Sequence, residues 1–178
     1  MKIYNGEIKQ IGIEAAINNE ENGHLYISGG TINSIGGKAS IYNKEGTVEI
    51  SGNAQLTSNA SGITTDSLER GTVQNLVNGT INITGGTIVG TDGHAISNYG
   101  IITLGVEDGN INTSSPNIRG ENYGVKNFRT FNYFDGIIKG LNSAIDGTIS
   151  SQEQNTQIVN DTETIDEKTY STVHLEAN

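Results

Sequence analysis

Short runs in which apolar and polar residues alternate recur along the chain, and each run is followed by Gly, Asn or Asp. The apolar members of four such runs are Leu25/Ile27, Ile81/Ile83, Ile102/Leu104 and Phe131/Tyr133. Alternation over a few positions is typical of half-buried β-strands. The spacing of an amphipathic helix is not sustained anywhere, and each Gly inside a helix would cost about 1 kcal/mol. The pattern therefore predicts an all-β chain of short strands.

An aliphatic residue close to a Gly- or Asp-containing turn marks a repeat with a period near 24 residues. The equivalent residues are Ile8, Ile32, Leu56, Ile88, Ile111 and Ile137, with separations of 24, 24, 32, 23 and 26 residues. Such a unit accommodates two or three short strands with their corners, and stacked units bury one another's apolar faces. The longest separation indicates a loop inserted at 68–77. A second irregularity covers 113–122 and includes the only proline, Pro116.

A small residue paired with an aliphatic one gives each unit a second landmark. The aliphatic members are Ile17, Ile41, Ile63, Ile96, Val125 and Ile145. In four units an Asn stands two positions later, at Asn19, Asn43, Asn98 and Asn127. Asn tolerates left-handed corners, and identical Asn side chains on stacked strands can hydrogen-bond in a ladder. Both properties explain why Asn recurs at this place in the unit.

The pattern changes after Ile149. Residues 151–178 lack Gly and hold six acidic residues with a single Lys, and alternating apolar positions flank a polar turn near 166–168. This composition predicts two or three short strands. A stack of repeats exposes unpaired strand edges at its end, so we expect this segment to be a polar cap or a linker to a following module. The predicted organisation is therefore repeats over 1–150 and a β-rich cap or linker over 151–178.

The stretch at 85–100 begins Gly-Gly-Thr-Ile and ends Gly-His-Ala-Ile-Ser-Asn-Tyr-Gly, and a similar stretch occupies 29–43. These stretches resemble the repeats of adhesin-like surface proteins of Gram-positive, Firmicute-type bacteria, with a β-helix of the pectate-lyase-like kind. The resemblance implies one right-handed parallel β-solenoid of about six turns, capped by β-structure, in a secreted or wall-attached modular protein. A Greek-key sandwich is the alternative fold, but it would not repeat equivalent landmarks at this period.

Length and charge narrow the function classes. The 178 residues suit one domain. Twenty acidic residues against ten basic ones give a net charge of −10, which argues against binding to nucleic acid phosphates and to anionic membranes. No apolar run approaches the roughly 18–20 residues of a membrane-spanning helix. The absence of Cys excludes disulfides and Cys-based zinc sites.

The function expected from these features is that of a non-catalytic structural and adhesive module. We expect it to be extracellular, at the bacterial cell surface, to adjoin further modules of a longer chain, and to contact a host or glycan ligand. The segments 66–79 and 113–122 are the expected contact points because they break the repeat. Tyr42 and Tyr99 adjoin the repeated Asn and are candidates for stacking on sugar rings.

Cleavage of a polysaccharide is the alternative function. Four basic residues, Arg119, Lys126, Arg129 and Lys139, lie close together in the sequence, with Asp108 and Asp135 in the adjacent units. A lyase needs a basic group and usually Ca²⁺, whereas a hydrolase needs two carboxyl groups about 5–9 Å apart. Arg119, Arg129, Asp108 and Asp135 are the candidate catalytic residues under this alternative.

Metal binding has little support in the sequence. Asp92, Asp108 and Asp135 could approach one another on neighbouring units and offer oxygen ligands to Ca²⁺, but corner Asp residues that shape turns are the favoured interpretation. His24, His94 and His174 show no ligand-like spacing, so we expect them to be solvated and expect no metal site or cofactor.

Overall fold

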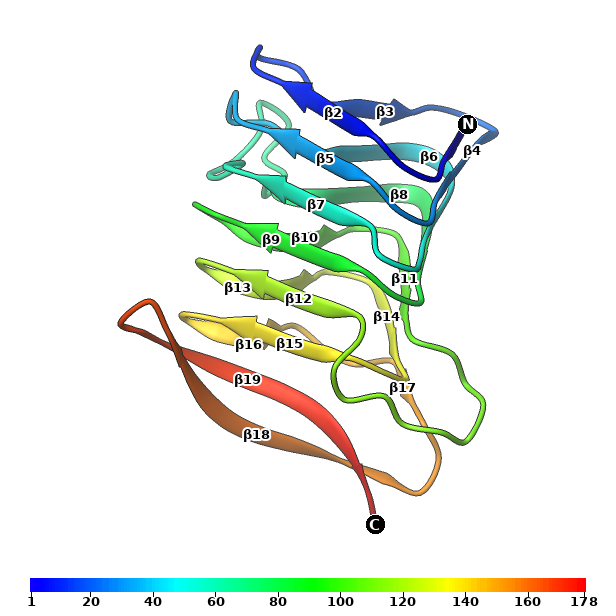
Figure 1. Cartoon of the computed structure of the whole chain (residues 1–178), viewed down its shortest axis with the longest axis vertical. Coiled ribbons are helices and arrows are strands. Elements are labelled where there is room, and N and C mark those ends of the chain that lie inside the picture. Colours follow the sequence, from blue (N-terminus) through cyan, green and yellow to red (C-terminus); the bar gives the residue numbers. More distant parts are fainter.

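The computed structural model describes the whole chain as two β-sheets without a helix (Figure 1). The first sheet contains β1 (Lys2–Ile3), β3 (Ile17–Asn19), β4 (Gly23–Ile27), β6 (Ile41–Ile50), β8 (Gly71–Ile83), β10 (His94–Asn98), β11 (Ile101–Leu104), β13 (Tyr123–Asn127), β14 (Thr130–Tyr133), β16 (Ser143–Asp146) and β17 (Ser151–Gln152). The second contains β2 (Glu7–Gln10), β5 (Thr31–Ser34), β7 (Gln55–Ser58), β9 (Thr87–Gly90), β12 (Asn117–Gly120), β15 (Ile137–Gly140), β18 (Thr156–Ile165) and β19 (Lys168–Ala177). The predicted all-β class is confirmed. No helix is present that could cross a membrane.

Equivalent strands of successive repeats pair in parallel, and the chain advances along its long axis from β1 to the C-terminal hairpin (Figure 1). In the second sheet the residues in register are Ile8, Ile32, Leu56, Ile88, Ile118 and Ile138. In the first sheet they are Ile17, Ile41, Val73, Ile96, Val125 and Ile145. The predicted landmarks Ile111, Ile137 and Ile63 are therefore wrong; Ile118, Ile138 and Val73 hold those places.

The two breaks in the repeat lie earlier in the chain than predicted. Residues 71–83 form β8, so 68–77 is not an inserted loop; the insertion is the segment 59–70, which we call the 59–70 loop. Likewise, 117–120 form β12, and the irregular segment is 105–116. The landmark at Gly62-Ile63 misplaced the first break, because Ile63 imitates the small–aliphatic pair yet is exposed. The predicted contact segment 66–79 thus consists largely of paired strand, and β12 occupies the middle of 113–122.

An Asn ladder runs through the first sheet, parallel to the stacking direction. Its members are Asn19, Asn43, Asn75, Asn98 and Asn127, and each Nδ2 donates to the next Oδ1 at 2.8, 2.8, 2.8 and 2.7 Å. The four predicted positions belong to the ladder, and Asn75 is a fifth member that the sequence analysis did not identify. The Gly that follows leaves room for these amides: a Cβ at Gly79 would collide with the side chains of Asn43 and Asn75.

One apolar core lies between the sheets. Inward-facing side chains from both sheets belong to a single cluster of 25 buried residues, in which Ile, Leu and Val of one repeat pack on those of the next. Alternation places their neighbours outside; in β6, for example, Ile41 and Asn43 are buried while Tyr42 is half-buried. A continuous core of this kind is what makes single repeats dependent on their neighbours.

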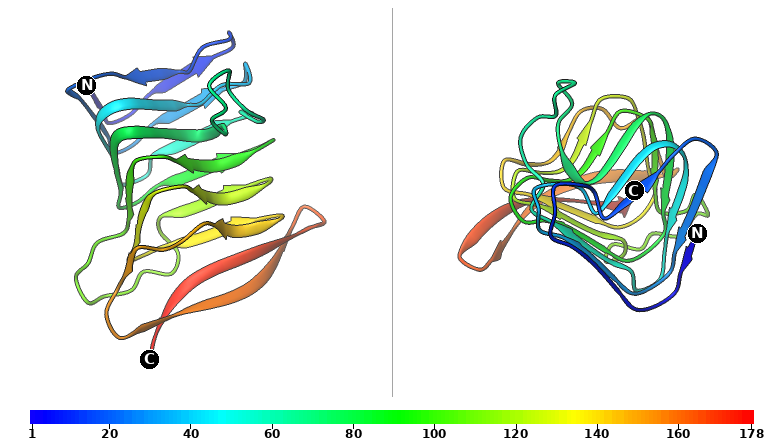
Figure 2. Two further views of the ribbon diagram at one scale, coloured as in Figure 1. Left: turned by 180° about the vertical axis from the view of Figure 1, so that it is seen from behind. Right: turned by 90° about the horizontal axis from the view of Figure 1, so that it is seen from above.

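The C-terminal segment is a hairpin that covers the last repeat (Figures 1 and 2). β18 and β19 pair antiparallel around Asp166 and Glu167, whose φ angles of 48° and 64° form the tight turn. β19 also pairs antiparallel with β15, and Val173 and Leu175 join the core. The predicted strands around a polar turn are confirmed, and the edge of β15 is occupied as expected of a cap.

Candidate functional site

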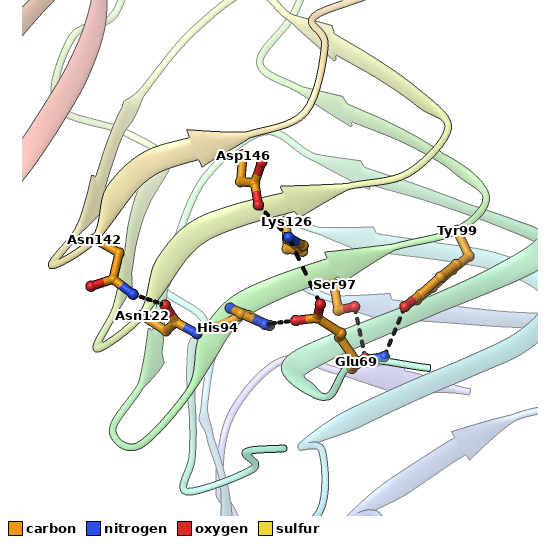
Figure 3. Close-up of polar contacts among 8 residues, drawn as sticks. All are labelled: Glu69, His94, Ser97, Tyr99, Asn122, Lys126, Asn142 and Asp146. Atoms are coloured by element: carbon orange, nitrogen blue, oxygen red, sulfur yellow. Dashed lines mark hydrogen bonds and ion pairs between the residues drawn. The ribbon is translucent and has the colours of Figure 1, made fainter. Parts of the chain in front are cut away.

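The 59–70 loop projects from the stack (Figure 2) and returns against β10. Its last turns are fixed by backbone contacts of Glu69: the Glu69 N–H donates to the Tyr99 hydroxyl at 2.8 Å, and the Ser97 hydroxyl donates to the Glu69 carbonyl at 2.8 Å (Figure 3). All five residues of β10 are buried. The loop therefore divides the outer face of the first sheet into two regions.

On the C-terminal side of the loop, four titratable side chains form what we call the Glu69 network: Glu69, His94, Lys126 and Asp146 (Figure 3). Glu69 Oε2 lies 2.6 Å from His94 Nε2, and its Oε1 lies 3.8 Å from Lys126 Nζ. Lys126 also pairs with Asp146. The hydrogen bond to Asp146 raises the pKa of Lys126, so the ammonium stays charged. Register brings the network together, because Ser97, Lys126 and Asp146 lie side by side on β10, β13 and β16.

His94 is the most enclosed member of the network. Its side chain is 4% exposed, and its ring stacks on Tyr123 with centroids 5.3 Å apart. Burial lowers the pKa of His94, and the hydrogen bond with Glu69 opposes that shift only in part. The ring is therefore neutral near pH 7, with Nε2–H donating to Glu69 and Nδ1 left without a partner. The expectation of a solvated His94 is wrong, because the sequence did not reveal that the 59–70 loop covers it.

An aromatic group borders the network. Lys126 Nζ lies 4.8 Å from the centroid of the Tyr123 ring and 5.4 Å from that of Phe128. Phe128 in turn stacks on Tyr99 with centroids 4.3 Å apart and planes 8° from parallel. Tyr99, a predicted sugar-stacking residue, thus has its ring against Phe128 and its hydroxyl bound by the loop.

On the N-terminal side of the loop lies a groove of about 260 Å³, which we call the Tyr42 groove. Its principal lining residues are Glu14, Lys38, Tyr42, Asp66, Arg70 and Gln74. Partial burial, followed by the nearby Asp66 carboxylate, raises the pKa of Tyr42, so its hydroxyl remains protonated. Of the two predicted sugar-stacking residues, only Tyr42 lines a groove. Tyr42 shares that groove with Asp66 and Arg70 of the loop, whereas the Tyr99 hydroxyl accepts from the Glu69 N–H of the same loop.

The four basic residues that are close in sequence are divided between the two sheets. Arg119 and Lys139 are neighbours on β12 and β15; the Arg119 guanidinium lies 5.7 Å from the Tyr170 ring centroid, and Lys139 pairs with Glu163 at 2.7 Å. Lys126 belongs to the Glu69 network in the first sheet. Arg129 follows β13 and donates to the Val77 carbonyl at 3.1 Å. A single basic patch therefore does not form.

The predicted acidic residues serve the corners. Asp135 accepts hydrogen bonds from the backbone N–H of Val106 at 3.1 Å and of Asn112 at 2.6 Å, which holds the 105–116 segment in place. Asp108 lies within that segment and accepts from Asn110 N–H at 2.9 Å. Asp92 follows β9, at the opposite end of the second sheet's strands from the segment that precedes β12. No group of three or more His, Asp or Glu is arranged to hold a metal ion.

Sequence reasoning did not single out Glu69, Asp146, Arg70 or Gln74. Their places follow from the register and from the course of the 59–70 loop, and the only signal in the sequence was the longest separation between landmarks. Comparisons with protein-family models, with curated proteins and with solved structures find no match for this chain.

Proposed function

We propose that this chain is a right-handed parallel β-solenoid that serves as a non-catalytic structural and adhesive module of a secreted or wall-attached bacterial surface protein. The parallel ladders support the solenoid, since each repeat pairs in register with the next through both sheets. Backbone pairing, the Asn ladder and a continuous core make such a stack stiff, as a spacer between neighbouring modules requires. The hairpin blocks one end of the stack, which leaves the sheet faces for contact with a ligand.

The observation that carries the non-catalytic assignment is the state of the Glu69 network. A general acid or base must reach the proton of a bound substrate, at about 2.6–3.2 Å or through one water. His94 is closed off by the 59–70 loop and Tyr123, and its Nε2 is bound to Glu69. Lys126 is held by Asp146. These groups fix the loop to the sheet, so the network is an anchor for a recognition surface.

Polysaccharide cleavage remains the second candidate because Glu14 and Asp66 both line the Tyr42 groove. Two carboxyl groups in one groove are the minimum for glycoside hydrolysis. Both residues are exposed to solvent, however, so neither has the apolar surroundings typical of the general acid in such a pair. The adhesive role therefore accounts better for the groove.

Incubation with a panel of host and plant polysaccharides, scored for retention and chain scission together, tests this proposal. We expect retention of the protein on at least one glycan or host-cell surface without any scission. Scission that disappears in Glu14→Gln or Asp66→Asn would make the protein an enzyme. Failure to be retained on any glycan or cell surface would contradict adhesion and leave only the spacer role.

A further inference from the structure

The floor of the Tyr42 groove contains a buried amide with no partner. Gln74 is 3% exposed, yet its Nε2 makes no hydrogen bond, and it lines the groove. Arg70, beside it, has a buried Nε that also lacks a partner. Nearly all buried donors in folded proteins are satisfied. Two unsatisfied donors in one groove therefore point to a ligand that brings acceptor oxygens to this floor.

The register places three further features in line. Asn18, Tyr42 and Gln74 are adjacent on β3, β6 and β8 and all line the groove. Neighbouring strands lie about 4.8 Å apart, so an amide, a phenol ring and a second amide follow one another over roughly 10 Å. An aromatic face flanked by polar groups that fix orientation is typical of small-molecule sites. Two linked pyranose rings have that length and that alternation of apolar faces and hydroxyls.

The charges of the groove indicate which kind of sugar it accepts. Lys38 and Arg70 are cationic, Glu14 and Asp66 are anionic, and none of the four belongs to an ion pair. Donors and acceptors are thus equally available, and their charges balance. Hydroxyl groups match this mixture because each one donates and accepts. An anionic sugar would gain no net attraction from these balanced charges and would be repelled by the net charge of −10.

We infer that the Tyr42 groove binds a neutral saccharide, with one ring packed on Tyr42 and hydroxyl oxygens accepting from Gln74 and Arg70. The inference rests on the proposed adhesive function and assigns its ligand class. The 59–70 loop contributes Arg70 and Asp66 to the site, and the Glu69 network holds that loop in place. Binding of the saccharide thus depends on the 59–70 loop, which is an insertion in the repeat.

Calorimetric titration of the full chain with neutral tetrasaccharides of glucose and of mannose, and with tetragalacturonate, tests the inference. We expect one neutral probe to bind and tetragalacturonate to bind at least tenfold more weakly. Gln74→Leu and Tyr42→Ala should each weaken binding at least tenfold. Tyr4→Ala is the matched control, since Tyr4 is 61% exposed and lies outside the groove, and its affinity should equal that of the wild type. Thermal melts of every variant verify that the fold is intact.

Each other result overturns the inference in a distinguishable way. If the wild type and both folded groove variants bind the sugar with equal affinity, the sugar binds outside the Tyr42 groove, and the adhesive function is not contradicted. Tighter binding of tetragalacturonate would contradict the neutral ligand class. Absence of binding to all three probes, together with retention on host cells, would refute a saccharide site while keeping the adhesive function. Absence of both sugar binding and retention on cells would contradict adhesion as well and leave only the spacer role.

Discussion

The two sides of the 59–70 loop treat polar groups in opposite ways. In the Glu69 network, the three charged side chains and Nε2 of His94 all have partners, and His94 is shut away from solvent. In the Tyr42 groove, four charged residues form no ion pair, and the buried Gln74 amide lacks a hydrogen bond. The same short segment supplies Glu69 to one side and Asp66 and Arg70 to the other. The loop thus has an anchoring side and an open side.

Under the proposed function, this difference separates the groups that stabilise the stack from those that contact a ligand. Leaving a buried donor unsatisfied costs about 1–3 kcal/mol, and a scaffold with a surplus of stability from its core and ladders tolerates such a cost at one place. The regular repeats carry that surplus, and the two unsatisfied donors of the groove come from Arg70 of the insertion and Gln74 of β8. Substitutions should therefore lower the free energy of unfolding most in the Asn ladder, less on the anchoring side of the loop and least on its open side.

The largest effect on stability is expected in the Asn ladder of the first sheet, where Asn75 is the middle member. Its Nδ2 donates to Gly79 O, Asn98 Oδ1 and Ile101 O at 3.1, 2.8 and 3.0 Å, and its Oδ1 accepts from Asn43. Asn75→Ala leaves these buried partners unsatisfied, so we expect the free energy of unfolding to fall by about 2–4 kcal/mol in urea denaturation.

Asn19→Ala is the control for the ladder, because Asn19 lies at its end and has only one neighbouring Asn. Asn19→Ala should lower the free energy of unfolding by less than half as much as Asn75→Ala does. Equal losses at the two positions would show that each amide acts on its own corner, and that the ladder adds nothing through its continuity.

The anchoring side is tested by Glu69→Ala. The substitution removes the acceptor of His94 Nε2–H and one partner of Lys126. We expect a loss of about 1–3 kcal/mol in the free energy of unfolding, together with faster proteolysis within 59–70. Asp66→Ala in the same loop removes an exposed carboxylate without an ion pair and should change stability by less than about 0.5 kcal/mol. Similar losses for both variants would contradict the division of the loop into two sides.

Much of this scaffold follows from the sequence because its causes are local or periodic. Alternation specifies which side chains of a strand face the core, and the Gly and Asn of each corner recur with the period, so strands, period and four ladder positions were predictable. The boundaries of the insertion were not, because Gly62-Ile63 carries the same local signal as a true landmark while Val73 pairs with Ile41 and Ile96. Only the register of neighbouring repeats distinguishes them.

The site was less predictable than the scaffold for a related reason. Contacts such as Glu69–His94 join an aperiodic loop to a strand 25 residues later, and no spacing rule places a loop on a sheet face. Basic residues close in sequence were equally misleading, because alternate strands of a repeat belong to different sheets, as Lys126 and Lys139 show. Tyr42 and Tyr99 were both chosen as candidates because each adjoins the repeated Asn, but only Tyr42 lines the groove.

A smaller effect is expected from pH. Burial keeps the pKa of His94 in the folded chain below its ordinary value of 6.5, although Glu69 and Asp146 oppose the shift and Lys126 reinforces it. Below pH 6.5 the unfolded chain therefore binds a proton at His94 more readily than the folded chain does. The contribution of His94 to the free energy of unfolding is complete above pH 6.5 and declines as the pH falls toward the folded-state pKa. Urea midpoints between pH 7.5 and 5 should fall less steeply for His94→Gln than for the wild type. Parallel slopes would mean that His94 is solvated.

The smallest effect on stability is expected from Gln74→Leu, and it is also the most discriminating. Leu has a similar volume and replaces an amide whose Nε2 has no partner in the folded chain. Exchange of an unsatisfied buried polar group for an apolar one of the same shape is close to neutral or stabilising, so the free energy of unfolding should stay within about 0.5 kcal/mol of the wild type or rise. A loss above about 1 kcal/mol would show that the amide has a structural partner. Unchanged stability together with lost sugar binding in Gln74→Leu is the result that only a ligand-facing Gln74 produces. If the amide had a structural role, the variant would lose both stability and sugar binding, and if it had no role, the variant would lose neither.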